Sequence, residues 1–319
     1  MGVKERIQYI DVAKGVGILL MIAGHIWGGL IQAWIYSFHM PLFFILSGMT
    51  ISIDLDVRRY ISKMLYSYIT FSFLSLIYIS TIQILQGTIE VQSLSIEILS
   101  LVLFWGIGNL WFIPCLTLSK LLFIFLYKFK PLVPVAVSIT ASIIIIIYYL
   151  AGNTYRSLDT VFLKSIIGIF FIAVGYRLRS LVAVLFKDKI LIWIMLSVFT
   201  FSHFFLFYIS GFKLMDLNTL NIGNPILFFI EAIMGSSSII ILSIIIQNNR
   251  FLSFVGEYSL LFLAINYFNI IVALSREFFT FANANINNLA AFFCMLFFEV
   301  LVVKNIIKYF PIIVSYPKL

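Results

Sequence analysis

Three ionisable side chains lie near the start of the chain, in a stretch where apolar residues otherwise dominate. Asp11 and Lys14 are three residues apart, and His25 follows Lys14 after ten further residues. In a helix this spacing makes about three turns and about 16 Å of rise, so Lys14 and His25 share one face. Asp11 is close enough to pair with Lys14. An ammonium here could hold a phosphate, and an imidazole could take a proton from a hydroxyl group.

A second histidine follows in the run Ser37-Phe38-His39-Met40-Pro41. Because proline is tolerated in the first turn of a helix, Pro41 indicates that a second helix begins here, with His39 at or just below its outer end. We expect His25 about two turns below the outer end of its own helix, near enough for the two imidazoles to share a general-base role. The alternatives are snorkelling to the cytoplasmic interface for Lys14, a hydrogen bond to a neighbouring helix for His25 and interfacial anchoring for His39.

The elements that position these residues are long apolar runs. The chain has 319 residues, of which 62% are hydrophobic and 11% charged, whereas soluble domains carry about 25% charged residues. The runs are continuous and do not alternate as barrel strands do, and about 20 helical residues cross a bilayer. We therefore expect an all-α polytopic bundle, a single domain over residues 1–319, with about ten transmembrane helices. The predicted spans are 12–31, 38–53, 61–83, 109–127, 132–150, 160–178, 189–209, 224–246, 254–275 and 289–309.

The distribution of positive charge predicts the orientation. With both termini cytoplasmic, inner segments hold most of the cations and outer loops hold only Arg156, Lys213 and Arg276, as the positive-inside rule requires. The cytoplasmic set is Lys4, Arg6, Arg58, Arg59, Lys63, Lys128, Lys130, Arg177, Arg179, Lys187, Lys189, Arg250, Lys304, Lys308 and Lys318. The net charge of +8 therefore reflects topology and does not indicate a nucleic acid partner. We expect a multi-pass protein of the inner (plasma) membrane, in contact with lipid.

Other polar residues are weaker candidates. Asn109 and Trp111 begin a predicted helix at the outer face, where an aromatic ring could stack on a sugar or simply belong to an interfacial belt. Asp159 opens another helix, as a cap or as a ligand for the acceptor. His203 fits a satisfied or interfacial histidine better than a ligand.

Two acidic residues and two cysteines lie inside apolar segments. Glu231 and Glu299 should face the bundle interior. Cys115 and Cys294 are typical of small buried hydrophobic residues. The spacing of the histidines and cysteines does not support a metal site, so we expect none.

Several motifs together resemble the membrane-bound acyltransferase 3 family, and within it the fucose 4-O-acetylase-like branch. The main ones are Lys14-x10-His25, the run from Phe38 to Phe44 with Ser47-Gly48, and Leu110-Trp111-Phe112-Ile113-Pro114; Ser157-Leu158-Asp159, Gly175-Tyr176 and Phe254 to Leu260 add weaker matches. With the ten-helix layout, the resemblance covers nearly the whole chain. Lys14 departs from the arginine usual in this family and lacks its bidentate fork. Asn266 stands where relatives often have histidine.

The resemblance implies transfer of an acyl group, usually acetyl, from cytoplasmic acyl-CoA to a hydroxyl of a cell-surface or lipid-linked glycan. Acetyl-CoA or another acyl-CoA would then be the donor substrate. Lys14, paired with Asp11, would hold the CoA phosphates, while His25, aided by His39, would act as the general base. Acceptor binding would fall to the residues at the outer face, Asn109, Trp111 and Asp159.

A transporter or flippase for a polysaccharide precursor is the competing interpretation. Such proteins more often show inverted internal repeats and helices broken at the membrane midplane by Gly or Pro. The sequence shows neither feature clearly.

Overall fold

The structure of the chain is a computed structural model, and it describes residues 7–87, 91–150, 157–185, 188–266, 270–281 and 283–311. Within these ranges the chain is helical, and the β pairing is limited to an isolated bridge between Asp216 and Asn221. This confirms the all-α polytopic class. Some of the cations that carry the orientation argument lie outside the described residues, and the orientation stays a prediction. They are Lys4, Arg6, Arg156, Lys187 and Lys318.

Among the described residues, eight helical stretches are long and apolar enough to cross a membrane, against about ten predicted. They are Gln8–Ile26, Gly29–Thr50, Val57–Ile84, Gly108–Phe129, Val161–Val182, Lys189–Ile209, Pro225–Ile245 and Ala284–Tyr309. Each overlaps a predicted span. The predicted span 132–150 corresponds to α7 (Val133–Leu150), which contributes the shorter apolar stretch Val133–Ile144.

The predicted span 254–275 is wrong as a single helix. The structure divides it among α11 (Arg250–Glu257), α12 (Ser259–Ile265) and α13 (Ile270–Phe278). The side chain of Asn249 accepts from the Leu252 amide and begins α11, and Tyr258 leaves helical geometry and ends it. Capping groups at this spacing favour a short helix over a continuous one.

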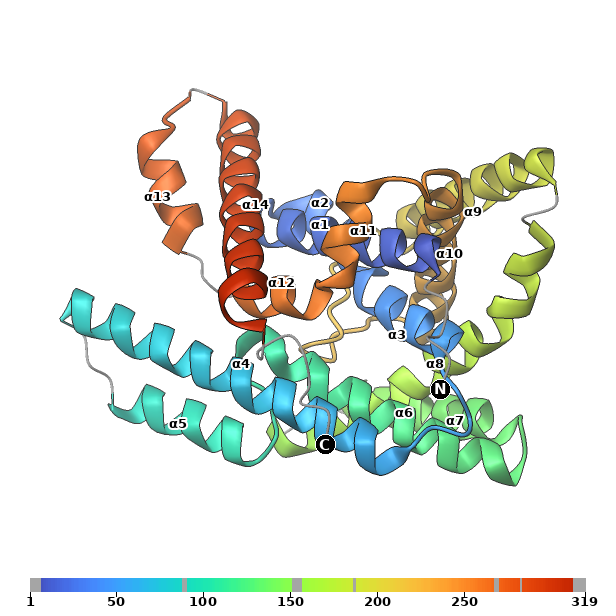
Figure 1. The fold of residues 1–319 in the computed structure, drawn as a ribbon. Helices are drawn as coiled ribbons and strands as arrows, with labels where there is room; N and C mark the ends of the chain where they lie inside the picture. Colours follow the sequence, from blue (N-terminus) through green and yellow to red (C-terminus); the bar gives the residue numbers. More distant parts are fainter. Residues whose placement is uncertain are drawn as a thin grey trace. The chain divides into compact units, whose positions relative to one another are not determined.

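The helices pack as two units, of which the first comprises Met1–Ile51 and Ile169–Ser259. It contains α1 (Gln8–Ile26), α2 (Gly29–Tyr36), α3 (His39–Thr50), the later part of α8 (Ser157–Leu185), α9 (Lys189–Ile209), α10 (Pro225–Ile245) and α11. In this unit α1 packs against α2, α3, α10 and α11, and α10 also packs against α9 (Figure 1). The helix that carries Lys14 and His25 is therefore surrounded by neighbours within its own unit.

Two helix crossings in this unit depend on glycine. A Cβ atom on Gly15 would overlap the carbonyl of Leu252, and one on Gly256 would overlap the carbonyl of Asp11. In the same way Gly48 of α3 lies directly against the backbone of α8. Glycine lets two helix backbones approach this closely, which is how membrane helices gain packing energy.

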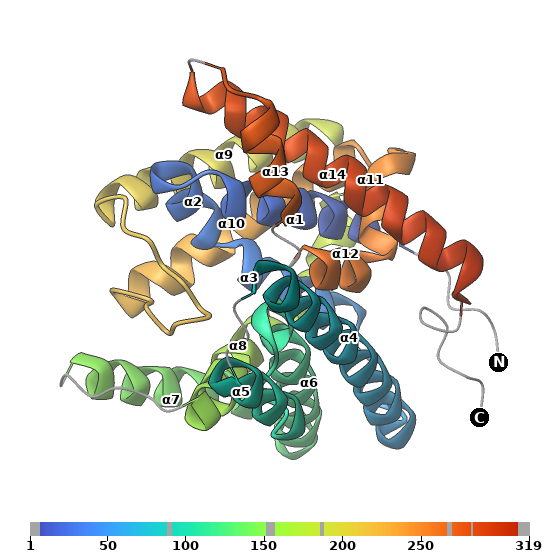
Figure 2. The same cartoon turned by 90° about the vertical axis from the view of Figure 1, so that its left-hand side faces the viewer.

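The second unit comprises Ser52–Gly168 and Leu260–Leu319. It contains α4 (Val57–Gln86), α5 (Val91–Val102), the 3₁₀ helix η1 (Gly108–Trp111), α6 (Phe112–Phe129), α7, the start of α8, α12, α13 and α14 (Ala284–Tyr309). In it α4 and α5 run side by side, and α13 lies along α14 (Figures 1 and 2). The single-domain assignment stays a prediction.

Candidate functional site

Lys14 and Asp11 form the predicted ion pair on α1. The Lys14 Nζ lies 3.7 Å from the Asp11 Oδ1, which confirms the pairing. The Asp11 side chain is 10% exposed and that of Lys14 is 30% exposed. Pairing offsets the cost of holding both charges among apolar residues. The partial exposure of the ammonium would let it reach an anionic group.

His25 lies in the last turn of α1, because the helix ends at Ile26. The expectation that His25 lies two turns below the helix end is therefore wrong. The cause is the glycine pair at residues 28–29: Gly29 has φ of 63°, and α2 begins at once instead of α1 continuing to residue 31. His25 is an exposed residue, and Asp216, between α9 and α10, lies within electrostatic range of its imidazole.

The structure brings His25 and His39 to the same aromatic ring. The Tyr36 ring centroid lies 6.2 Å from that of His25 and 4.8 Å from that of His39. His39 begins α3 and is buried, and its Nδ1 lies 3.1 Å from the carbonyl oxygen of Ile35. That bond uses Nδ1 as the donor and leaves Nε2 without its proton and able to accept one. Pro41 lies in the first turn of α3, as predicted.

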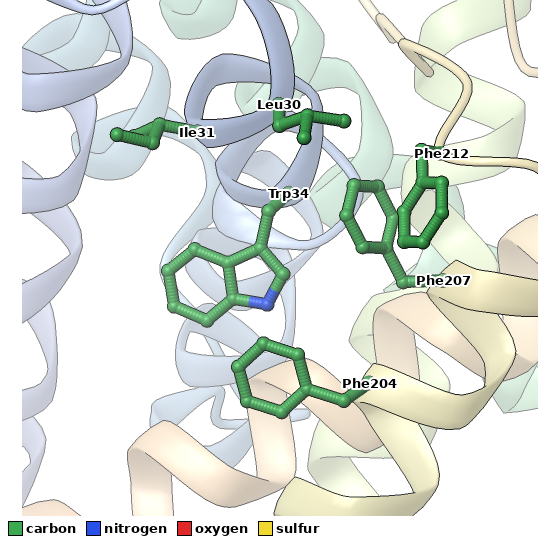
Figure 3. Close-up of a pocket in the computed structure, with 6 residues that line it drawn as sticks. All are labelled: Leu30, Ile31, Trp34, Phe204, Phe207 and Phe212. Carbon is green, nitrogen blue, oxygen red and sulfur yellow. The ribbon is translucent and has the colours of Figure 1, made fainter.

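The other side of α2 borders an apolar cavity of about 350 Å³ (Figure 3). It is lined by Leu30, Ile31, Trp34, Phe204, Phe207 and Phe212. Residues 30, 31 and 34 share one helical face, whereas Tyr36 lies on the opposite face. A single short helix thus separates the two histidine rings from a cavity that contains no charged side chain.

His203 is buried behind this cavity in a polar cluster with Ser37 and Glu231. Its Nε2 lies 3.0 Å from the Ser37 Oγ and 4.0 Å from the Glu231 Oε1. Glu231 is fully buried, as expected for an acidic residue inside a membrane segment. The sequence interpretation of His203 as a satisfied histidine agrees with this position, although no sequence spacing links these three residues.

The candidate acceptor-binding residues Asn109, Trp111 and Asp159 belong to the second unit. Asn109 is half-buried in η1, and Trp111 is buried with the Lys164 ammonium 4.6 Å from its ring centroid. The face of this indole is therefore engaged by a cation. Asp159 lies in the first turn of α8, and its side chain is outside the described part of the chain.

Glu299 has a partner that the sequence did not identify. The Asn266 Nδ2 donates to the Glu299 Oε1 over 3.0 Å, and both side chains are buried in the second unit. Asn266 follows α12, so it comes from the interrupted segment and not from a continuous helix. Of the two cysteines, Cys115 is buried and Cys294 is half-buried, and both are free thiols.

Sequence reasoning singled out Lys14, His25 and His39 but missed Tyr36 and Asp216. Tyr36 carried a signal, since it lies three residues before His39 and eleven after His25. Asp216 carried none, because it comes from a loop distant in sequence. Among the described residues, no group of three or more His, Cys, Asp or Glu side chains could hold a metal ion. The catalytic roles of His25 and His39 and the binding role of Lys14 stay predictions.

A protein family model described as an acyltransferase domain matches residues 7–303. This range includes every described residue of the site. No curated protein and no solved structure matches the chain.

Proposed function

Because the chain belongs to this acyltransferase family, we propose that it transfers an acyl group, expected to be acetyl, from cytoplasmic acyl-CoA to a glycan hydroxyl. The family match and the long apolar helices make it a multi-pass membrane acyltransferase. The acceptor in this proposal is a cell-surface or lipid-linked saccharide, and the membrane is the inner (plasma) membrane. On the motifs around His25 and His39, we also place it in the fucose 4-O-acetylase-like branch.

The cluster of His25, Tyr36, His39 and Asp216 is the observation that carries the proposal for the site. His25 is exposed, so its imidazole can meet a hydroxyl group. In the proposed step, the imidazole takes the hydroxyl proton while the acceptor oxygen attacks the thioester carbonyl carbon. The carbon–sulfur bond then breaks, the CoA thiolate takes up the proton, and the products are an ester and free CoA.

The remaining members of the cluster support that step electrostatically and sterically. The negative charge of Asp216 would stabilise the imidazolium form of His25 as it appears. The Tyr36 ring packs against the rings of both histidines. Lys14 lies eleven residues before His25 on α1, about 16 Å of helix rise. In this proposal Lys14 binds the CoA phosphates and the pantetheine arm covers the distance between the two residues.

One observation favours a transporter or flippase, the second candidate. The interrupted segment α11–α12–α13 is similar to the discontinuous helices that many transporters use at their substrate sites. The family match favours transfer chemistry, so we rank this alternative second.

The proposal is tested in proteoliposomes supplied with acetyl-CoA, by measuring free CoA thiol with and without an acceptor saccharide. We expect acceptor-dependent release in the native protein. His25→Ala should lower turnover by about 10²-fold or more, the usual contribution of a general base. Ser243→Ala is the matched control, because this buried hydroxyl donates only within its own helix, to the Ile239 carbonyl. Near-normal turnover in the His25 variant at equal membrane abundance would reject this base.

Transport of a saccharide without CoA release would instead favour the second candidate. Comparison of surface glycan esters in cells with and without the protein identifies the acceptor and the acyl group together.

A further inference from the structure

The polar cluster behind the cavity lies directly beneath the turn that joins α2 to α3. Ser37 and Phe38 form this turn, between Tyr36 at the end of α2 and His39 at the start of α3. His203 reaches the turn from α9, and Glu231 reaches His203 from α10. Helices α9 and α10 therefore meet the α2–α3 turn at one buried point, Ser37, which is one residue from Tyr36 and two from His39.

The hydroxyl protons fix the direction of the hydrogen bonds in this cluster. Ser37 donates its single hydroxyl proton to the carbonyl of Trp34, over 2.9 Å. Its oxygen is then an acceptor towards His203, so the proton between them belongs to the His203 Nε2. The Ser37 hydroxyl in the α2–α3 turn therefore accepts a hydrogen bond from the His203 imidazole of α9.

Glu231 is placed to influence the His203 imidazole, because the two nearby serine hydroxyls donate to backbone carbonyls. The hydroxyl of Ser210, near Glu231, donates to the Phe207 carbonyl, as that of Ser37 does to its own helix. No hydrogen bond from a described residue reaches either carboxyl oxygen of Glu231. The Nε2–H of His203 lies 4.0 Å from the Glu231 Oε1, beside the Ser37 and Ser210 hydroxyls. This placement favours the tautomer that donates towards the turn.

The same turn is held by two further contacts from α10. The Ser236 hydroxyl lies 3.4 Å from the carbonyl of Phe38. Gly235 packs against the Phe38 ring so closely that a Cβ atom would overlap it. The Phe38 ring also meets the His203 ring edge-on, with centroids 4.9 Å apart. These contacts converge on the two-residue turn from both α9 and α10.

We propose that His203, Glu231 and Ser37 form a buried positioning network that sets the placement of Tyr36 and His39 for acyl transfer. The inference rests on the proposed function for the site, but the network itself is defined by contacts inside the first unit. His203 is the central residue, since it joins the turn to α10. It touches neither donor nor acceptor in this proposal. Trp34 and Phe204 separate it from the cavity in Figure 3, with ring centroids 5.8 and 6.0 Å from its own.

The test compares two variants of His203 in the full-length protein. His203→Gln keeps an N–H donor for Ser37, whereas His203→Phe keeps the ring volume and removes the donor. We expect kcat to fall about tenfold in His203→Phe, with KM for acyl-CoA unchanged, because a tenfold loss corresponds to one hydrogen bond of ordinary strength. In His203→Gln most of the native kcat should be restored. Ser37→Ala should match His203→Phe, while Ser243→Ala, an equally buried serine, should match the native protein.

A second measurement separates this network from the reaction. Hydrogen exchange of the amides in residues 36–39 should be several-fold faster in His203→Phe and Ser37→Ala than in Ser243→Ala. Unchanged exchange overturns the network, whether or not the native protein transfers an acyl group. The positioning role would be overturned if exchange became faster while kcat stayed native, or if the two His203 variants had equal kcat. It would also be overturned if the loss of activity in each variant were proportional to its loss of folded protein. Absent acyl transfer in the native protein would count against the proposed function alone.

Discussion

The ring of Tyr36 lies 4.8 Å from the ring of His39, centroid to centroid, and its other neighbour in the site is His25, at 6.2 Å. The chain places these three rings on three consecutive helices, α1, α2 and α3. Tyr36 therefore contacts both candidate catalytic imidazoles, which also lie within electrostatic range of each other. This geometry follows from the early end of α1 and the two-residue turn between α2 and α3.

Removal of the Tyr36 ring should separate the two histidines. Tyr36→Phe keeps the ring and should retain turnover within about threefold, because the ring contacts do not need the hydroxyl. Tyr36→Ala should lower turnover by about tenfold, since an aromatic pair contributes about 0.5–1.5 kcal/mol beyond the area that it buries. Turnover is measured as acceptor-dependent CoA release at equal membrane abundance. A large loss in both variants would instead assign the function to the hydroxyl.

Lys14 should affect binding of the donor and not the chemical step. Lys14→Gln is expected to raise KM for acyl-CoA by about tenfold with kcat nearly unchanged, because a group that binds substrate and transition state equally changes KM alone. The rise in KM should shrink at high salt, where the charge is screened. Lys63→Gln, an exposed lysine near the start of α4, is the control. If Lys14→Gln lowered kcat and left KM unchanged, Lys14 would not be the donor site.

The sequence predicted the membrane class, most of the spans and the Lys14–Asp11 pair, because these depend on local composition and spacing. It missed the end of α1 because residues 27–31 are nearly as apolar as the helix before them, and only Gly29 marks the turn. It missed the break in the segment 254–275 for a similar reason. Hydropathy measures how apolar a segment is and does not detect where a cap ends a helix.

Long-range partners were beyond sequence reasoning. Asp216 comes near His25, and His203 comes near Ser37, only because α9, α10 and the intervening loop fold back against the first three helices. Each of these residues lies more than 160 positions from its partner. A single sequence carries no spacing signal over such separations, whereas an i, i+3 pair on one helix is readable at once.

The crossing of α1 and α11 should not tolerate a side chain at its contact points. Gly15→Ala and Gly256→Ala each introduce a methyl group into the backbone of the opposing helix. Overpacking of this kind costs about 1–3 kcal/mol or more, so we expect lower thermal midpoints in detergent and lower membrane abundance. Gly28→Ala is the matched control, because a Cβ atom there meets no atom within 4 Å. Equal midpoints for all three variants would contradict the close approach of these helices.

The pair of Asn266 and Glu299 offers a stability test that does not depend on the site in the first unit. Asn266→Ala removes the amide that donates to the Glu299 Oε1 and leaves the buried carboxyl without this partner. An unsatisfied buried polar group costs about 1–3 kcal/mol, so the free energy of unfolding in detergent should fall by that amount. Asn248→Ala, at an exposed position between α10 and α11, should change it by less than about 0.5 kcal/mol. Glu299→Gln should lie close to the native protein, because a glutamine oxygen can accept the same hydrogen bond. If Asn266→Ala and Asn248→Ala had the same unfolding free energy, the buried hydrogen bond would contribute nothing to the fold.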